Sequence, residues 1–177
     1  MKKITTVVIL FIIFLIIYFL QSNFFTWFNI DGIKPNLFIV LIVFIGLFAG
    51  RNISIIFGAV IGVFLDIFIG EIFGISVIMY ALLGLLSGYF NNNFSKESRI
   101  TIMLMIMGAT FVFEFGMYII GAIILKTDIE WIQFAKIGLI EVLFNTILII
   151  ILYPLLRFSG YQVEKIFKGE KKLTRYF

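Results

Sequence analysis

The sequence predicts an all-α integral membrane protein, a compact bundle of about six transmembrane helices with both termini in the cytoplasm. Of the 177 residues, 62% are hydrophobic and 14% are charged, whereas soluble domains average about 45–50% and about 25%. The mean hydropathy is +1.16. The apolar residues also form continuous runs close to the roughly 20 residues that cross a bilayer as a helix. Strands of a membrane barrel would instead alternate apolar and polar residues.

The first three apolar runs are expected to cross the membrane at residues 4–20, 35–49 and 53–69. The first is longer than the apolar core of a signal peptide, and no small-residue cleavage site follows it, so we expect it to be retained. The second lies between Lys34 and Arg51 and is short. Because the third is short as well, a tilted or partly re-entrant path stays open for both.

The remaining spans are expected at residues 72–90, at residues 100–125, and from residue 131 or 133 to residue 156. The asparagines at 91–93 end the fourth span, and Pro154 lies near the end of the sixth. Two near-minimal turns, at residues 51–52 and 70–71, join the second, third and fourth spans. These three helices are therefore expected to be antiparallel neighbours.

The orientation follows from the distribution of Lys and Arg in short loops, which favour the cytoplasmic side. With the N-terminus inside, eleven of the 14 basic residues fall on the inner side. We expect one transmembrane domain over residues 1–177, in which residues 160–177 form a basic cytoplasmic tail. That tail could lie on the anionic inner leaflet or contact a protein. Since orientation explains the net charge of +4, no nucleic-acid partner is expected.

Small residues recur at the four-residue spacing that lets membrane helices approach closely. Ser54 begins such a row in the third span, and Gly46 and Gly50 have the same spacing in the second. We expect a tight helical hairpin here, and the alternative is that the glycines leave space for a ligand. A partner's transmembrane helix is expected to bind either the row around Gly58, Gly62 and Asp66 or the neighbouring lipid-facing groove. The candidate residues for helix packing or partner binding are Gly58, Gly62, Asp66, Gly70, Gly74, Tyr80, Gly84 and Gly88.

Three acidic residues within the spans are further candidates, since charged groups in a bilayer usually face protein or water. Asp66 lies one turn from the outer end of its span, where it could cap the following turn. Glu114 is near the centre of the fifth span, and Glu141 and Asn145 form a pair one turn apart in the sixth. These buried polar residues predict a shared core between the last two spans. It is either a structural hydrogen-bond network or part of an ion path.

The composition removes most catalytic chemistry. The chain has no Cys and no His, so thiolate and imidazole nucleophiles, bases and metal ligands are absent. It also lacks a GxSxG elbow, an HExxH motif and a glycine-rich phosphate loop. We therefore expect no catalytic residues, no bound metal and no cofactor, and a function in binding rather than catalysis.

Several motifs together resemble the MreD family of bacterial membrane proteins. A single span is followed by Lys34-Pro35-Asn36-Leu37, where the family often has Pro-Asp-Leu. A glycine-rich helix then ends in Leu65-Asp66, and a Tyr- and Gly-bearing helix follows it. Tyr153-Pro154 comes near the end of the last span. The order and spacing of these pieces cover nearly the whole chain.

The resemblance implies a non-enzymatic scaffold of the bacterial elongation (rod) complex in the cytoplasmic membrane. It would support cell shape and lateral peptidoglycan synthesis through helix–helix contacts. The partners implied are MreC, MreB (directly or indirectly), RodA, a class B penicillin-binding protein and membrane lipid.

Two other functions stay open. Six short apolar helices also resemble, in outline, the substrate-binding subunits of energy-coupling-factor vitamin transporters. That resemblance implies an outward pocket near Trp27, Asp66, Glu71 and Trp131. However, the Ala-rich docking motif common in such subunits is missing. A small channel or proton-coupled carrier built on Glu114 and Glu141 is the third possibility.

Overall fold

The chain folds into a bundle of helices, and the computed structural model describes residues 2–70, 72–90, 98–128 and 130–168. The only β-type pairing in these residues is an isolated bridge between Ile30 and Ile33. The predicted all-α membrane fold is therefore confirmed. Glu71, Asn91–Asn93 and residues 169–177, about which the sequence made predictions, lie outside the described residues.

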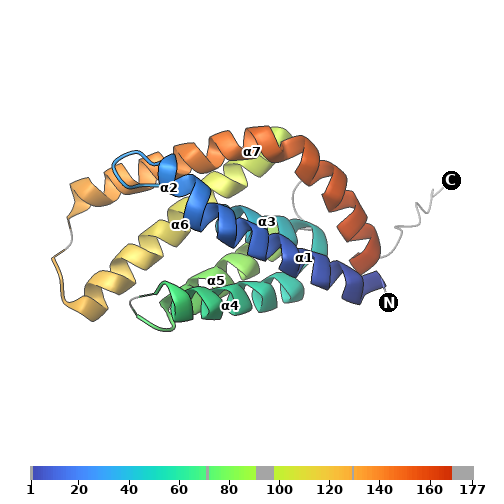
Figure 1. Cartoon of the computed structure of the whole chain (residues 1–177), viewed down its shortest axis with the longest axis horizontal. Helices are drawn as coiled ribbons and strands as arrows, with labels where there is room; N and C mark the ends of the chain where they lie inside the picture. The colour runs from blue at the N-terminus through green and yellow to red at the C-terminus, as the bar shows by residue number, and fades with distance from the viewer. Residues whose placement is uncertain (1, 71, 91–97, 129, 169–177) are drawn as a thin grey trace.

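The helices α1 (Lys2–Phe19), α3 (Leu37–Ala49), α4 (Arg51–Phe68), α5 (Ile75–Phe90), α6 (Arg99–Leu125) and α7 (Trp131–Lys168) alternate in direction. A π-helical turn, Leu20–Phe24, and the short α2, Phe25–Trp27, extend α1. The start of α1 and the end of α7 lie at one end of the bundle (Figure 1). The opposite end, here called the pocket end, carries α2, the loop of residues 28–36, and the α4–α5 and α6–α7 connections.

Within the part of the chain that the structure describes, four helical segments are long and apolar enough to cross a membrane: Lys3–Trp27, Arg51–Phe68, Arg99–Leu125 and Trp131–Phe167. Among the described residues, α3 and α5 are apolar but shorter. At 1.5 Å per residue, α3 is about 20 Å long, whereas the hydrocarbon core is about 30 Å thick. α3 is the short second span of the sequence prediction. It can be shorter than the hydrocarbon core because all 13 of its residues are buried within the bundle.

The central position of α3 organises the other helices. It contacts α1, α4, α5, α6 and α7. Ile39, Ile42 and Ile45 on α3 are completely buried. On α1, the Phe14 ring packs edge-on against Phe64 of α4, with centroids 5.1 Å apart. The core therefore runs along α3, and the outer faces of the surrounding helices remain apolar and exposed.

The tightest pair is the α4–α5 hairpin. A Cβ added at Gly58 would overlap the backbone carbonyl of Tyr80, and one added at Gly84 would overlap the carbonyl of Ser54. The Ser54 hydroxyl donates a 2.6 Å hydrogen bond to the carbonyl of Gly84. Such close backbone contact is how small residues hold membrane helices together.

The last helix differs from the expected sixth span, which was placed to end at residue 156. α7 continues through Pro154 to Lys168, so residues 160–168 of the expected tail extend this helix. Gly160 lies against the ring of Phe48 at the end of α3, and Val163 is buried. These contacts with the bundle stabilise the helix beyond the proline, which alone would favour a break or kink.

Candidate functional site

A buried polar network surrounds the N-terminus of α3. The backbone N–H of Asn36 donates to Asn145 Oδ1 at 2.9 Å, and Asn145 Nδ2 donates to Thr110 Oγ1 at 3.0 Å. The Tyr80 hydroxyl donates to Asn36 Oδ1 at 3.3 Å, and Gln21 Oε1 accepts from the N–H of Leu37 at 3.1 Å. The side chains of Gln21 and Asn145, from two other segments, thus accept from backbone donors that a helix start leaves free.

Two carboxyl groups lie beside this network. Glu114 on α6 and Glu141 on α7 are close enough to interact, and Glu141 also contacts the Asn36 side chain. Glu141 is 7% exposed, and its buried Oε1 atom has no hydrogen-bond partner among the described residues. The structure therefore brings together all three predicted buried polar residues, Glu114, Glu141 and Asn145. It adds Asn36, which the sequence singled out only as a departure from a motif.

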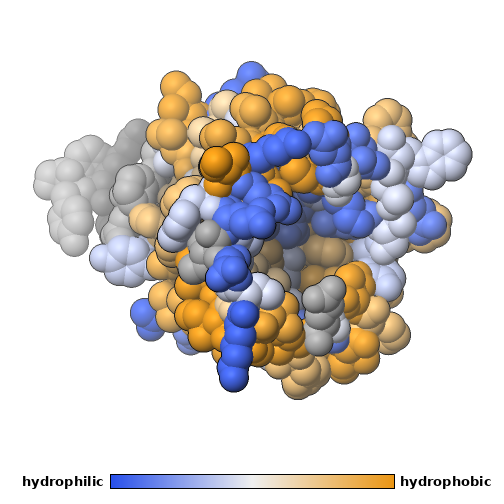
Figure 2. Space-filling view, turned by 90° about the vertical axis from the view of Figure 1, so that its left-hand side faces the viewer, coloured by the Kyte–Doolittle hydropathy of each residue, from blue (hydrophilic) through white to orange (hydrophobic). Residues whose placement is uncertain are grey.

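Two adjacent pockets open above the start of α3. The large pocket, about 820 Å³, is lined by loop residues 31–34 and 36 and by the first turns of α7, including Glu141. The small pocket, about 440 Å³, reaches Asp66 and Tyr80. Gln21, Lys34 and Asn36 line both pockets. Figure 2 views this end and shows hydrophilic residues gathered across it, between hydrophobic flanks.

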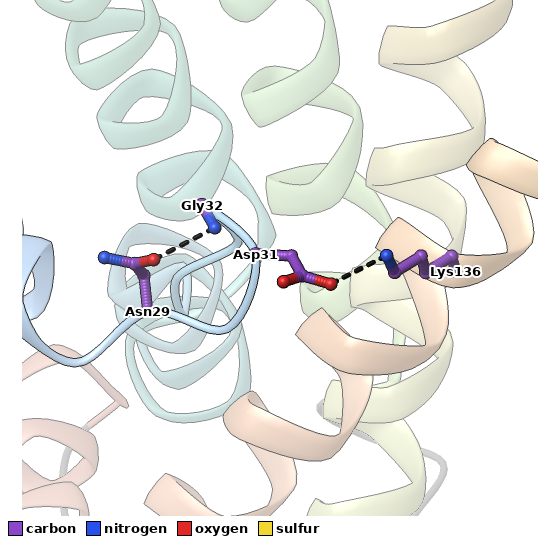
Figure 3. A network of polar contacts seen from close by, with 4 residues as sticks. All are labelled: Asn29, Asp31, Gly32 and Lys136. Carbon is purple, nitrogen blue, oxygen red and sulfur yellow. Dashed lines mark hydrogen bonds and ion pairs between the residues drawn. The ribbon is translucent and has the colours of Figure 1, made fainter.

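The rim of the large pocket is formed by the loop that leads into α3. Asp31 points toward α7 and forms a 2.7 Å ion pair with Lys136 (Figure 3). Asn29 Oδ1 accepts from the N–H of Gly32 at 2.9 Å and holds the turn. The hydrogen bond from Lys136 and its positive charge lower the pKa of Asp31 below its ordinary value. The ion pair therefore links the loop to α7 at neutral pH.

Asp66 caps α5 rather than facing the large pocket. Its Oδ2 atom accepts from the N–H groups of Gly74 at 2.7 Å and Val77 at 3.4 Å. Its Oδ1 atom accepts from the N–H of Ser76 at 3.2 Å. Gly74 has a φ of +104°, a conformation that glycine adopts at little cost. The carboxylate at the end of α4 thus supplies acceptors for the start of α5.

The structure also shows where the predicted glycine row lies. Gly62 faces the backbone of Val77, and Gly88 faces Arg51, so both are within the α4–α5 interface together with Gly58 and Gly84. Gly70 lies against Asp66, and a Cβ at Gly74 would meet open space. Of the two places predicted for a partner's helix, the row of Gly58, Gly62 and Asp66 is occupied within the chain, and the neighbouring lipid-facing groove stays a prediction. Gly58 and Gly62 already hold α5 of the same chain, and Asp66 caps that helix.

Sequence reasoning missed the pocket residues Gln21, Lys34 and Lys136. Their signal was weak, because each lies near the end of an apolar run, where polar residues are ordinary. The vitamin-transporter resemblance placed a pocket near Trp27, Asp66 and Trp131. Asp66 does line the small pocket, whereas Trp27 is 88% exposed and Trp131 is 58% exposed.

Comparison with known proteins supplies a family. Residues 1–159 match the family described as rod shape-determining protein MreD. Comparison with curated proteins and with solved structures gives no significant match. The family match covers α1 to α6 and most of α7, including the α4–α5 hairpin and the polar network. The chain therefore belongs to the MreD family of rod shape-determining proteins.

Proposed function

We propose that this protein is a non-enzymatic scaffold of the bacterial rod complex, acting in the cytoplasmic membrane through helix–helix contacts. The observation that carries the proposal is the family match over residues 1–159. The physical character of the chain agrees with it, since a helical bundle with short loops offers partners mainly its membrane-facing surface. MreC, MreB, RodA and a class B penicillin-binding protein are the partners we propose, with lipid around the bundle.

The surface that best suits such a contact is the outer side of α1 and α4. The two helices border an apolar groove of about 330 Å³, lined by Val7, Val8, Phe11, Ile56, Phe57 and Val60. Ile56 is 63% exposed and Val8 is 51% exposed. In lipid, helices associate through close packing rather than burial of apolar area alone. We propose that a single transmembrane helix of a partner protein occupies this groove.

Depletion of the protein in its host tests the cellular role. We expect rods to round or swell and newly labelled wall material to lose its lateral pattern. Normal shape, with growth restored by an added vitamin, would contradict the scaffold role and indicate a transporter subunit.

Photo-crosslinking tests the proposed surface. A photoreactive residue in place of Val60, within the groove, should capture a membrane partner in intact cells. Leu143 on α7 is 61% exposed and lies outside the groove, so the same replacement there is the matched control. Equal capture at both positions, or capture at Leu143 alone, would exclude the groove as the docking surface.

A further inference from the structure

A groove lies between α5 and α6, in the half of the bundle away from the pocket end. Its volume is about 450 Å³, within the usual range of about 300–1,000 Å³ for ligand sites. Leu83 and Ser87 line it from α5, and Met105 and Gly108 line it from α6. Gly108 is exposed, and a Cβ added there would meet nothing within 4 Å. The groove is therefore open on this side to the surrounding membrane.

The groove is apolar and reaches deep between the two helices. Apart from one Ser and one Thr, its lining consists of apolar residues, and the Ser87 hydroxyl already donates to the carbonyl of Gly84 at 3.2 Å. Val43 of the central α3 forms part of the lining and is 2% exposed. A transmembrane helix is about 10–12 Å wide with its side chains and would rest on the rim. A lipid acyl chain is thin enough to reach Val43.

Two basic residues flank the groove where α5 ends and α6 begins. Phe90 of α5 and Thr101 of α6 line the groove there. Arg99 precedes Thr101 by two positions, and the backbone of Arg51 lies against Gly88 in the last turn of α5. Both arginines are exposed, and neither forms an ion pair with another described residue.

The charges around this end of the bundle are predominantly basic (Figure 1). Glu164 on α7 is the only acidic residue that the described part of the chain places there. By sequence, residues 91–97 carry one basic and one acidic side chain, and residues 169–177 carry three basic and one acidic. The Arg99 guanidinium lies 4.9 Å from the centroid of the Tyr153 ring, a contact that does not neutralise its charge. A ligand that extends out of the groove at this end therefore meets positive charge, which attracts anionic lipids.

We propose that the α5–α6 groove binds one acyl chain of an anionic phospholipid, whose headgroup lies between Arg51 and Arg99. Packing holds the chain, since it leaves one apolar environment for another, and the two guanidinium groups select the negative headgroup. The second acyl chain stays in the bilayer, because the groove is open at Gly108. The inference goes beyond the scaffold role and does not depend on it, since binding is measured on the isolated protein.

The first test labels the wild-type, full-length chain in phosphatidylethanolamine nanodiscs. A trace of phosphatidylglycerol carries a photoreactive diazirine in one acyl chain, and mass spectrometry maps the labelled positions. We expect label concentrated on the groove residues of α5 and α6. Phosphatidylethanolamine with the same diazirine should give about tenfold less label there. Label spread evenly over the apolar surface, or equal labelling by the two lipids, would overturn the proposal.

Filling the groove tests its role directly. Gly108→Leu should abolish the preferential labelling, because the new side chain occupies the open space. Gly121→Leu is the matched control: Gly121 is on the same helix and also has nothing within 4 Å of an added Cβ, but it lines the small pocket. Size-exclusion chromatography checks folding, and the wild-type map alone decides if Gly108→Leu misfolds. Equal labelling of the two folded variants would overturn the assigned groove.

The headgroup contact is tested by removing each positive charge. Arg51→Gln and Arg99→Gln should each lower the preference for phosphatidylglycerol over phosphatidylethanolamine by about fivefold. Lys3→Gln is the control, because Lys3 is exposed on α1 at the same end and is not part of the groove. An unchanged preference in both arginine variants would overturn the headgroup assignment.

A helix of another protein is the alternative occupant, and crosslinking in intact cells distinguishes it from lipid. Leu104 lines the groove and is 63% exposed. A photoreactive residue in its place should capture phospholipid, seen as an increase in mass. Capture of a protein at this position instead would overturn the proposal.

Discussion

At the scale of single residues, polar side chains at the pocket end satisfy the starts of two helices. Asp66 accepts from the first turn of α5, and Gln21 and Asn145 accept from the first N–H groups of α3. Few other acceptors are available inside a membrane bundle. Removing any of these side chains would therefore leave backbone N–H groups without a partner and lower the stability of the protein. The residue-scale predictions follow from that dependence.

Asp66→Ala should destabilise the protein by about 1–2 kcal/mol, because the start of α5 loses its capping acceptor. Unfolding in mixed detergent micelles measures the change. Asp128 is exposed, so Asp128→Ala should lie within about 0.5 kcal/mol of the wild type. Equal stability of the two variants would exclude the capping role.

Asn145→Ala should lower the stability by about 1 kcal/mol or more, because the buried N–H of Asn36 and the hydroxyl of Thr110 lose a shared partner. Thr146→Ala on the next position is the control, since the Thr146 hydroxyl bonds only the carbonyl of Val142 in its own helix. The same unfolding assay compares them. A larger loss for Thr146→Ala would contradict the network.

The Asp31–Lys136 pair predicts that the folding stability of the protein depends on pH under acidic conditions. Lys136 lowers the pKa of Asp31 below the ordinary value of 3.8, so the folded state favours the ionised carboxylate. The stabilisation is present above pH 3.8 and is lost as the pH falls through the lowered pKa. Both side chains are more than half exposed, so the effect is small and salt weakens it.

Comparing the wild type with Asp31→Asn tests this dependence. The difference in their unfolding midpoints should be greatest near neutral pH and low ionic strength, and it should vanish below the pKa of Asp31. If the difference in unfolding midpoint grew on acidification, the ion pair between Asp31 and Lys136 would not be its cause.

At the scale of secondary-structure elements, the glycines of α4 and α5 fix how closely the hairpin closes. Gly58 and Gly84 meet the backbone of the opposite helix, so any larger side chain separates the two. Gly108 on α6 has a similar helical backbone, but a Cβ there would meet nothing within 4 Å. The same change to alanine at Gly58, which is packed against a neighbouring helix, and at Gly108, which is not, therefore gives a matched comparison.

Gly58→Ala should destabilise the protein by about 1–3 kcal/mol through overpacking, whereas Gly108→Ala should be neutral or stabilising by up to about 1 kcal/mol. Unfolding midpoints of the two variants test this directly. Gly62→Leu should likewise prevent normal folding and not merely remove a partner, because Val77 of the same chain occupies its face. A normal yield of folded Gly62→Leu would contradict the close packing of Gly62 against Val77.

α7 shows how packing overrides a local signal. Pro154 removes a helical N–H donor, which favours an end or kink at this place. Tyr153 is nonetheless buried, and the Arg99 guanidinium lies 4.9 Å from its ring centroid. Contacts on both sides of the proline therefore hold one helix from Trp131 to Lys168.

At the scale of the whole molecule, the pockets follow from the unequal lengths of the helices. α3 has 13 residues and α6 has 27, a difference of about 20 Å in length. The central helix therefore does not fill the bundle at the pocket end. The loop of residues 28–36 and the polar side chains around Asn36 border the space that is left.

The positive-inside distribution predicts that the pocket end faces outward, and single cysteines test it because the chain has no Cys. Thr127→Cys at the pocket end should react with a membrane-impermeant maleimide in intact cells. Asn52→Cys at the opposite end should react only after lysis. Both positions are exposed. Labelling of Asn52→Cys in intact cells would show that the orientation is the opposite of the one predicted.

The sequence by itself determined the membrane class, the six apolar helices to within a few residues over most of their length, and the family. These features depend on local hydrophobic length and on charges between the runs, and neither requires knowledge of contacts. Helical spacing paired Glu141 with Asn145 on one helix, and a polar core shared with Glu114 of the other helix was a hypothesis. It was based on the need of each of these groups for a polar neighbour inside lipid.

Only the tertiary structure decided which helix lies at the centre, which glycines face which neighbour, and which loop residues line the pockets. Lipid-facing and core-facing side chains are equally apolar, so hydropathy cannot distinguish a buried α3 from an outer α1. Asn36 and Asn145 are 109 positions apart, and no local pattern connects them. Their contact depends on how α3 and α7 pack, which is a property of the folded chain.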